Sequence, residues 1–250
     1  MQILINATMK KKSVTFLVLL TLLVMIDRIA NAQTYVDLGL PSGTLWADRN
    51  VGAASPEDYG DYFAWGETTT KSNYTWSTYK YANGDYNKLT KYCSKSDFGN
   101  NGYTDTLTTL ERTDDAATAN WGSDWCMPTP AQFQELKANC TWTKTKRNGK
   151  QGYEVKGKNG NSIFLPAAGC RYGTDLGSAG SYGNYWSSSL FTDYPDSGRY
   201  LYFSSSYVDP DDWSGRRCGQ SVRAVQIILL FIFSGVFHYC LKNPRISTRF

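Results

Sequence analysis

The segment from Tyr182 to Val225 carries the side chains best suited to the chemistry of recognition. It is rich in Tyr, Trp, Ser, Gly and Asp. Antibody-type binding surfaces use this mixture because rigid aromatic rings give contact area at low entropic cost and small polar residues adapt their hydrogen bonds. We therefore predict a ligand-binding surface. Its candidate residues are Tyr200, Tyr202, Ser204, Tyr207, Asp209, Asp211, Asp212, Trp213, Ser214, Arg216 and Arg217.

A plainer interpretation of the same segment stays open. Leu201 and Phe203 would then be core residues, and the alternating Tyr and Ser side chains would merely coat a solvent-facing strand. Alternation by two residues fits both interpretations. Aromatic residues and arginine are the types enriched at interface hot spots, and they are dense here, so we favour binding.

Catalytic chemistry has little support in this sequence. The single histidine is His238, which lies beyond the main domain. This excludes Ser-His-Asp and Cys-His catalysis in that domain, and most zinc sites. Asp209, Asp211 and Asp212 offer oxygen ligands of the kind that calcium takes, although three clustered acids are more often a solvated loop. We expect no enzyme and no cofactor, with calcium-dependent sugar binding as an alternative.

The charge pattern bears on the class of partner. The formal net charge is only +4, and the basic residues are scattered apart from short runs at Lys10–Lys12 and Lys144–Arg147. A nucleic-acid-binding protein would show a basic stripe or a known module. We therefore expect no nucleic acid and predict a surface protein or a glycan as the ligand.

The first 32 residues have the pattern of a signal peptide. Lys10–Lys12 is a basic region, Val14–Ile26 is an apolar region, and Ala30-Asn31-Ala32 is a small-residue cleavage site. An uncleaved membrane anchor is the alternative. The pattern predicts an exported protein, either secreted or displayed on the cell surface, with its ligand-binding domain over residues 33–226.

Residues 227–250 form a separate tail. Its apolar run, Ile227–Leu241, is shorter than the roughly twenty residues that a spanning helix needs, and Lys242, Arg245 and Arg249 follow it. Basic residues after an apolar run are typical of a stop-transfer flank. The tail is thus either a membrane anchor or a read-through end without a selected role.

The domain contains an odd number of cysteines, namely Cys93, Cys126, Cys140, Cys170 and Cys218. None of their spacings is C-x-x-C, which argues against a metal knuckle or redox motif. Residues 68–110 show little periodicity, and so long an irregular segment is usually functional or pinned by a crosslink. We therefore predict a Cys93–Cys140 disulfide, with a reactive cysteine pair as the alternative.

Local signals predict an α+β domain with two short helices, an antiparallel sheet and long irregular loops. One helix is expected over 113–120 with Thr113 as its N-cap. The other begins at Thr129, where Pro130 and Gln132 complete a capping box. Alternation and turn signals indicate a hairpin within 35–47 and strands at 153–156, 162–166, 184–188, 200–204 and 221–225.

Several motifs in order resemble the Fibrobacter succinogenes major paralogous domain, an exported group common in gut Bacteroidetes. The resemblance covers roughly residues 35–225. It rests on Val36–Ala47, Tyr62–Glu67, Asp114–Ala117, Asn120–Gly122, Trp125–Thr129, Asn159–Gly169, Tyr185–Ser188 and Ser221–Arg223.

That group is similar to the formylglycine-generating-enzyme branch of the C-type-lectin-like fold. The resemblance implies two short helices packed on a twisted antiparallel sheet. The matching positions are Asp115-Ala116, Trp121-Gly122, Met127-Pro128-Thr129, Trp186-Ser187 and Val222-Arg223. Those enzymes use two closely spaced late cysteines, whereas Cys218 lacks such a neighbour, so a related oxidase remains only an alternative.

The late segment also resembles the variable proteins of diversity-generating retroelements, in which Asn codons are randomised between fixed Trp-Ser-Ser and Ser-Val-Arg motifs. This resemblance implies an adhesin or receptor whose binding surface varies. Randomising an Asn codon cannot produce tryptophan, so Trp213 would be a fixed position of the template or evidence against this resemblance. The residues that the scheme can produce are Tyr200, Tyr202, Ser204, Tyr207, Asp209, Asp211, Asp212, Ser214, Gly215, Arg217, Cys218 and Gly219.

Overall fold

A computed structural model describes residues 33–226, 232–233 and 236–237. The chain divides into two units, Met1–Thr34 and Tyr35–Phe250, and the fold below is that of the second. The predicted signal peptide lies outside the described residues. So does the predicted membrane anchor at 227–241, apart from β13 (Ile232–Phe233) and β14 (Val236–Phe237), which pair with each other. None of the described helices has the length and apolar character needed to cross a membrane.

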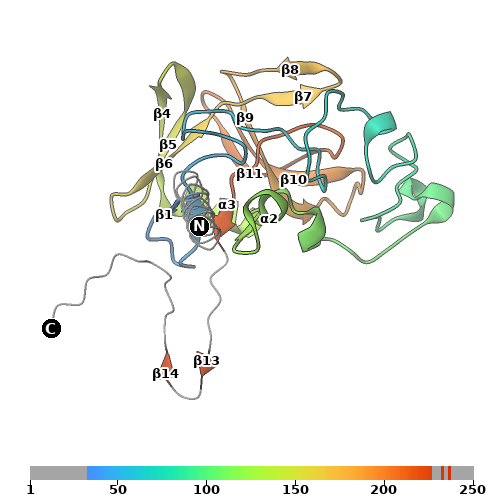
Figure 1. The fold of residues 1–250 in the computed structure, drawn as a ribbon, viewed down its shortest axis with the longest axis horizontal. Coiled ribbons are helices and arrows are strands. Elements are labelled where there is room, and N and C mark those ends of the chain that lie inside the picture. Colours follow the sequence, from blue (N-terminus) through green and yellow to red (C-terminus); the bar gives the residue numbers. More distant parts are fainter. Residues whose placement is uncertain (1–32, 227–231, 234–235, 238–250) are drawn as a thin grey trace, which may run out of the picture. The chain divides into compact units, whose positions relative to one another are not determined.

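The second unit is mostly sheet with two described α-helices, so the predicted α+β class is confirmed (Figure 1). The helices are α2 (Ala116–Trp121) and α3 (Pro130–Asn139). The described loops contain short 3-10 helices, namely η1 (Trp76–Thr78), η2 (Ser96–Phe98), η3 (Asn100–Gly102) and η4 (Arg112–Asp114).

The strands form four small sheets in this unit, besides the β13–β14 pair. The first has the order β1-β2-β12-β3, with β1 (Tyr35–Asp37), β2 (Leu45–Ala47), β12 (Val225–Gln226) and β3 (Trp125–Cys126). The second has the order β4-β5-β6, with β4 (Thr141–Arg147), β5 (Lys150–Lys156) and β6 (Ser162–Pro166). The others are the β7–β8 hairpin (Cys170–Tyr172 and Asp175–Gly177) and the order β11-β10-β9, with β9 (Gly183–Leu190), β10 (Ser197–Phe203) and β11 (Val208–Gly215).

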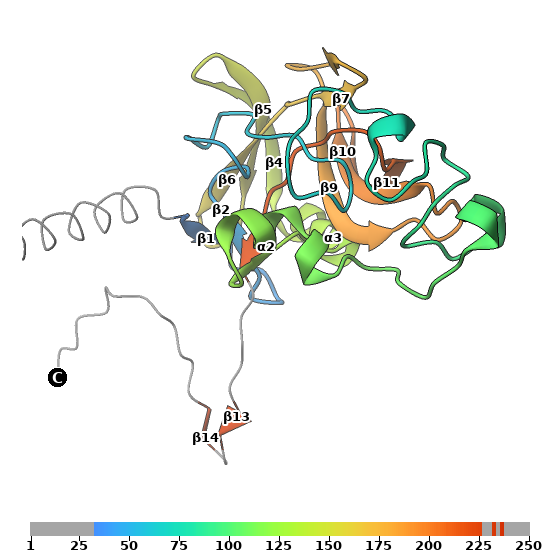
Figure 2. The same cartoon turned by 45° about the vertical axis from the view of Figure 1, so that its right-hand side comes forward.

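Helix α3 begins as the sequence predicts. The Thr129 side chain accepts from the backbone of Gln132, whose own side chain bonds back to the backbone of Thr129. Phe133 and Leu136 are buried, and α3 packs on the β9–β10–β11 sheet (Figure 2). The helix thus supports one face of the sheet that carries the late segment.

The predicted start of the earlier helix at Thr113 is wrong, because Thr113 lies in η4. Asp115 is the N-cap of α2, and its carboxylate accepts from the backbone N–H of Thr118 at 2.9 Å and of Met127 at 2.8 Å. One buried carboxylate therefore fixes both the helix start and the approach of the chain to α3.

The expected hairpin at 35–47 is present as β1 and β2, and the strands at 153–156, 162–166, 184–188 and 200–203 are confirmed. Only Val225 of the predicted strand 221–225 lies in a strand. The acidic stretch 208–215, which has no strand signal, forms edge strand β11. An edge strand tolerates Pro210 and half-exposed acids because one of its sides faces solvent.

The irregular region 68–110 is held by carboxylates rather than by a crosslink. Asp105 accepts from the backbone N–H groups of Tyr92, Cys93 and Leu107 at 2.7, 3.0 and 3.1 Å. Asp114 is buried and accepts from the hydroxyls of Tyr81 and Tyr92, the latter at 2.7 Å, and from Lys91 at 2.6 Å.

The predicted Cys93–Cys140 disulfide is not formed, because both cysteines are free in the structure. The buried Cys93 thiol donates to the carbonyl oxygen of Lys95 at 3.1 Å. Cys140 caps α3 and packs against the separate hydrophobic cluster that contains Phe133 and Leu201. The two thiols therefore lie in different packing environments, and the loop needs no disulfide to be ordered.

Candidate ligand-binding surface

Three tyrosines form a surface row at one end of the β9–β10–β11 sheet, and we call Tyr182, Tyr202 and Tyr207 the tyrosine row. Tyr182 precedes β9, Tyr202 lies in β10, and Tyr207 precedes β11. The ring centroid of Tyr202 lies 5.6 Å from that of Tyr182 and 6.5 Å from that of Tyr207. Tyr182 is 41% exposed and Tyr207 is 55% exposed. Three separate segments thus present large aromatic area to solvent at one place.

The tight β10–β11 connection positions the row. The backbone N–H of Ser204 donates to the carbonyl oxygen of Tyr207 at 2.8 Å, which closes the turn. The hydroxyl of Tyr207 donates to the carboxylate of Asp209 at 2.9 Å, and this hydrogen bond raises the pKa of Tyr207. Tyr207 therefore stays a neutral phenol that can also accept a hydrogen bond.

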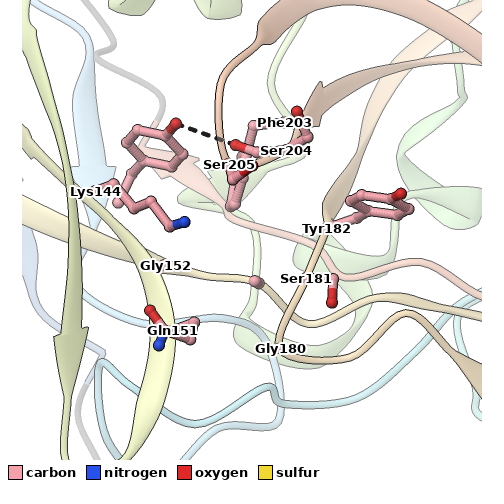
Figure 3. A pocket seen from close by; sticks show the side chains of 11 residues that line it. Lys144, Gln151, Gly152, Gly180, Ser181, Tyr182, Phe203, Ser204 and Ser205 are labelled. Atoms are coloured by element: carbon pink, nitrogen blue, oxygen red, sulfur yellow. Dashed lines mark hydrogen bonds between the residues drawn. The ribbon is translucent and has the colours of Figure 1, made fainter.

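A cavity of about 380 Å³ opens beside the tyrosine row (Figure 3). Tyr182 and Ser204 belong to its wall, so the row and the cavity are continuous. Its opposite wall comes from β4 and β5, which the late-segment prediction did not include. No signal in the sequence pointed to that wall, because the basic run at Lys144–Arg147 lies far from the late segment along the chain.

A second aromatic group, the tryptophan stack, consists of Phe191, Tyr194 and Trp213. The Trp213 ring lies 5.2 Å from that of Phe191 at an interplanar angle of 10°, and 5.8 Å from that of Tyr194 at 22°. Trp213 is 49% exposed. Arg199 covers Phe191 and forms an ion pair with Asp211 at 2.6 Å, so Asp211 is already bound within the protein.

Arg217 forms a third group with the exposed Tyr172 and the half-buried Trp76, two rings that the prediction for the late segment did not include. Its guanidinium carbon lies 5.1 Å from the ring centroid of Trp76 and 4.8 Å from that of Tyr172. It also donates to the Tyr172 hydroxyl at 3.1 Å. Planar guanidinium groups held between aromatic rings are preorganised for contact with a partner.

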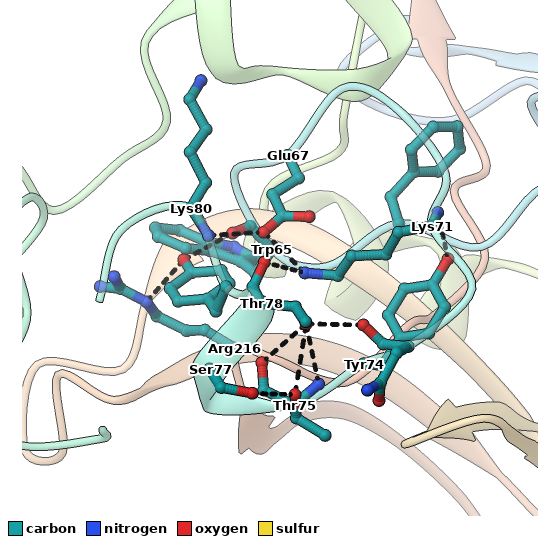
Figure 4. Close-up of polar contacts among 12 residues, drawn as sticks. Trp65, Glu67, Lys71, Tyr74, Thr75, Ser77, Thr78, Lys80 and Arg216 are labelled. Carbon is teal, nitrogen blue, oxygen red and sulfur yellow. Dashed lines mark hydrogen bonds and ion pairs between the residues drawn. The ribbon is translucent and has the colours of Figure 1, made fainter. Parts of the chain in front are cut away.

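Arg216 does not belong to any binding surface, which corrects the prediction. It is fully buried, and its guanidinium donates to the Tyr79 hydroxyl and to the carbonyl oxygens of Lys91, Tyr92 and Pro195 at 2.9–3.1 Å. It also stacks on Trp65, with 5.3 Å to the ring centroid (Figure 4). Because Lys91 and Tyr92 bind Asp114, these groups form one buried polar network.

Tyr200 is likewise mostly internal, although it was predicted to contact ligand. Its ring packs edge-on against Trp186 at 5.9 Å, and its hydroxyl donates to Asp212 at 3.0 Å. Burial and the Asp212 carboxylate raise the pKa of Tyr200. Ser214 is half-buried in β11. The contacts within the sheet therefore use Tyr200, Asp212 and Ser214, and these side chains do not add to the exposed aromatic surface.

The three clustered acids do not fit a calcium ion. Asp209 accepts from Tyr207, Asp211 pairs with Arg199, and Asp212 accepts from Tyr200, so the carboxylates serve three different partners. Within residues 33–226, no group of three His, Cys, Asp or Glu side chains is placed to share a metal ion. Calcium binding needs several oxygens converging on one point, and this segment does not supply them.

The late cysteines have the electrostatics of structural thiols. Cys170 and Cys218 lie on neighbouring segments that are joined by the Arg171–Gly219 backbone pairing. Burial raises the pKa of both thiols, which keeps them protonated. A thiolate is the reactive form of cysteine, so this environment disfavours nucleophilic or oxidative chemistry.

Neither a family model, nor a curated protein, nor a solved structure matches this chain.

Proposed function

We propose that this chain is an exported ligand-binding protein of the adhesin or receptor type, secreted or displayed on the cell surface, which binds a surface protein or a glycan without turnover. The tyrosine row carries the proposal, because two exposed rings and the half-buried Tyr202 ring converge there from three segments at one end of the β9–β10–β11 sheet. Tyr side chains give large contact area at low entropic cost. The tryptophan stack and Arg217 would extend the contact.

For the fold we propose the C-type-lectin-like arrangement of the Fibrobacter succinogenes major paralogous domain. The motifs that carry this resemblance supply much of the interior, which supports it. Trp46, Trp65, Trp186 and Arg223 are fully buried. Arg223 donates to Asn50 and to the carbonyl oxygens of Ala47, Asp48 and Phe164 at 2.9–3.2 Å, so the closing Ser-Val-Arg motif ties several segments together.

We further propose that the locus is diversified and that the variation is confined to part of the late segment. Tyr202, Ser204 and Tyr207 tolerate change because their side chains lie at the surface or half-buried. Gly219 does not, since a Cβ there would lie 2.6 Å from the Tyr74 ring. Deep sequencing of codons 180–225 across a population tests this. Variation at Gly219 as frequent as at Tyr207, or a uniform locus, would contradict it.

The binding proposal is tested with arrays of glycans and of extracellular proteins probed with the purified domain. Each ligand detected is titrated against the wild type and the double variant Tyr202→Ala/Tyr207→Ala. We expect at least a tenfold loss of affinity, since hot-spot aromatics typically contribute more than about 1 kcal/mol each. Tyr103→Ala is the control, because Tyr103 is a similarly exposed tyrosine in the irregular region after η3. Equal affinities for all three proteins would show that the surface is misplaced.

A further inference from the structure

The cavity beside the tyrosine row contains polar side chains without partners. Lys144, Gln151, Ser181 and Ser205 line it, and their side chains make no hydrogen bond or ion pair with any other residue in the part of the chain that the structure describes. Figure 3 shows the ammonium group of Lys144 directed into the opening. These donors come from two strands of one sheet and from two loops, so their convergence is a property of the tertiary structure.

The remaining wall is rigid and apolar. The Tyr153 hydroxyl donates to the carbonyl oxygen of Ser204 at 3.0 Å, which joins β5 to the β10–β11 turn across the cavity. Phe203 is buried against the backbone of Gly183, where a Cβ would lie 2.0 Å from the ring. The cavity is therefore preformed, and preformed sites bind with a smaller entropic cost.

The charge of the lining selects among ligands. Lys144 is the only ionisable side chain there apart from the two tyrosines, and no carboxylate lines the cavity. A cationic or acceptor-poor ligand would leave these donors without partners, whereas an anion bearing hydroxyl groups would satisfy them. At about 380 Å³ the space lies at the low end of small-molecule sites and suits one or two sugar rings.

We propose that this cavity binds a carboxylate-bearing sugar, a residue of the uronic-acid type in an acidic glycan. The Lys144 ammonium takes the carboxylate, and Gln151, Ser181 and Ser205 bind ring hydroxyls. The half-exposed ring of Tyr182 packs on the C–H face of the sugar. The inference rests on the proposed binding function and deepens it by naming a ligand class, but Lys144 and Gln151 lie outside the tyrosine row.

Calorimetric titration of the domain with trigalacturonic acid and with neutral galactotriose tests the proposal. We expect trigalacturonic acid to bind at least tenfold more tightly than galactotriose. Lys144→Gln should remove that difference, because a charge-assisted hydrogen bond is about twice as strong as a neutral one. Lys156→Gln is the matched control, because it removes the same charge from the other strand of the hairpin. Lys156 is exposed at the end of β5, where it pairs with Thr141 and not with Lys144.

The outcomes separate this inference from the binding proposal. Absence of trigalacturonic acid binding at millimolar concentration, equal binding of both sugars, or identical losses in the two lysine variants would each overturn the cavity assignment. The binding role of the tyrosine row would still be tested separately, by the affinity of the array ligands for Tyr202→Ala/Tyr207→Ala. Unchanged unfolding temperatures of both lysine variants show that the titrations compare folded proteins.

Discussion

Arg216 and Arg217 are neighbours in sequence, yet they belong to two regions that use the same residue types in opposite ways. Arg216 lies in the buried polar network with Lys91, Tyr92 and Asp114, where every charged group has a partner. Arg217 lies on the surface between two aromatic rings. The comparison teaches that Tyr, Arg and Asp side chains in this chain hold the fold together where they are mutually bonded, whereas the open ones are available for the contacts that we propose.

The same contrast separates the network from the cavity. In the network, one carboxylate satisfies two tyrosine hydroxyls and a lysine. At the cavity, a lysine, a glutamine and two serines have no partner within the described chain. Since buried polar groups are costly to leave unpaired while exposed ones are not, changes in the first region should affect stability and changes in the second should affect binding.

The largest expected effect is at Arg216. Arg216→Ala removes a buried cation and leaves three carbonyl oxygens and the Tyr79 hydroxyl without their donor. We expect a loss of about 4 kcal/mol in the free energy of unfolding, measured by denaturant titration. Arg217→Ala should cost less than about 1 kcal/mol. Similar losses of unfolding free energy in Arg216→Ala and Arg217→Ala would show that the two arginines do not differ in their structural role.

Asp114 should give the next largest effect, and a pH dependence. Its carboxylate is buried, which opposes ionisation, but the hydrogen bonds from Lys91, Tyr81 and Tyr92 outweigh burial and lower its pKa from 3.8 to about 2. The ionised form therefore stabilises the fold above about pH 4, and this contribution is lost as the pH falls toward 2. It amounts to about 2 kcal/mol. Asp114→Asn should remove a comparable amount at neutral pH.

Urea unfolding of wild type and Asp114→Asn between pH 2 and 7 measures this contribution. The difference in unfolding free energy should be largest near neutral pH and shrink in acid. A difference that does not change with pH would show that the Asp114 carboxylate keeps its ordinary pKa.

Substitutions on the open surface should lower ligand affinity and hardly change the free energy of unfolding. Tyr207→Ala alone removes a ring that is 55% exposed, whose hydroxyl donates to Asp209 and whose nearest aromatic ring, that of Tyr202, lies 6.5 Å away. Its free energy of unfolding should change by less than about 0.5 kcal/mol. The affinity for array ligands should fall several-fold, as fluorescence titration would measure. A stability loss comparable to that of Asp114→Asn would mean that the row is structural.

The smallest effect is expected at Cys140. Because this thiol is free, Cys140→Ser should change the unfolding free energy by less than about 1 kcal/mol, with or without reductant. Loss of a native disulfide would instead cost about 2–5 kcal/mol in the oxidised protein only. Alkylation of the unfolded, unreduced protein followed by mass analysis gives an independent readout, in which Cys93 and Cys140 should both be labelled.

Elements whose signals are local along the chain could be predicted from the sequence. The capping box at Thr129–Gln132 started α3 where it was predicted, because its hydrogen bonds join neighbours along the chain. Leu201 and Phe203 are both buried, as the plainer interpretation of the late segment expected, although the alternation alone did not choose between the two interpretations. A dense segment of Tyr, Ser and Asp also indicated where exposed aromatic residues would gather.

Which side chains of that segment are open to solvent depends on packing between distant parts of the domain. Arg216 and Tyr200 are internal because η1, β9 and the irregular region cover them, and no local pattern encodes that cover. The cavity wall formed by Lys144 and Gln151 was equally invisible in the sequence, since it depends on how β4 and β5 approach the β10–β11 turn. Burial and convergence are long-range properties, so they follow from packing rather than from composition or spacing.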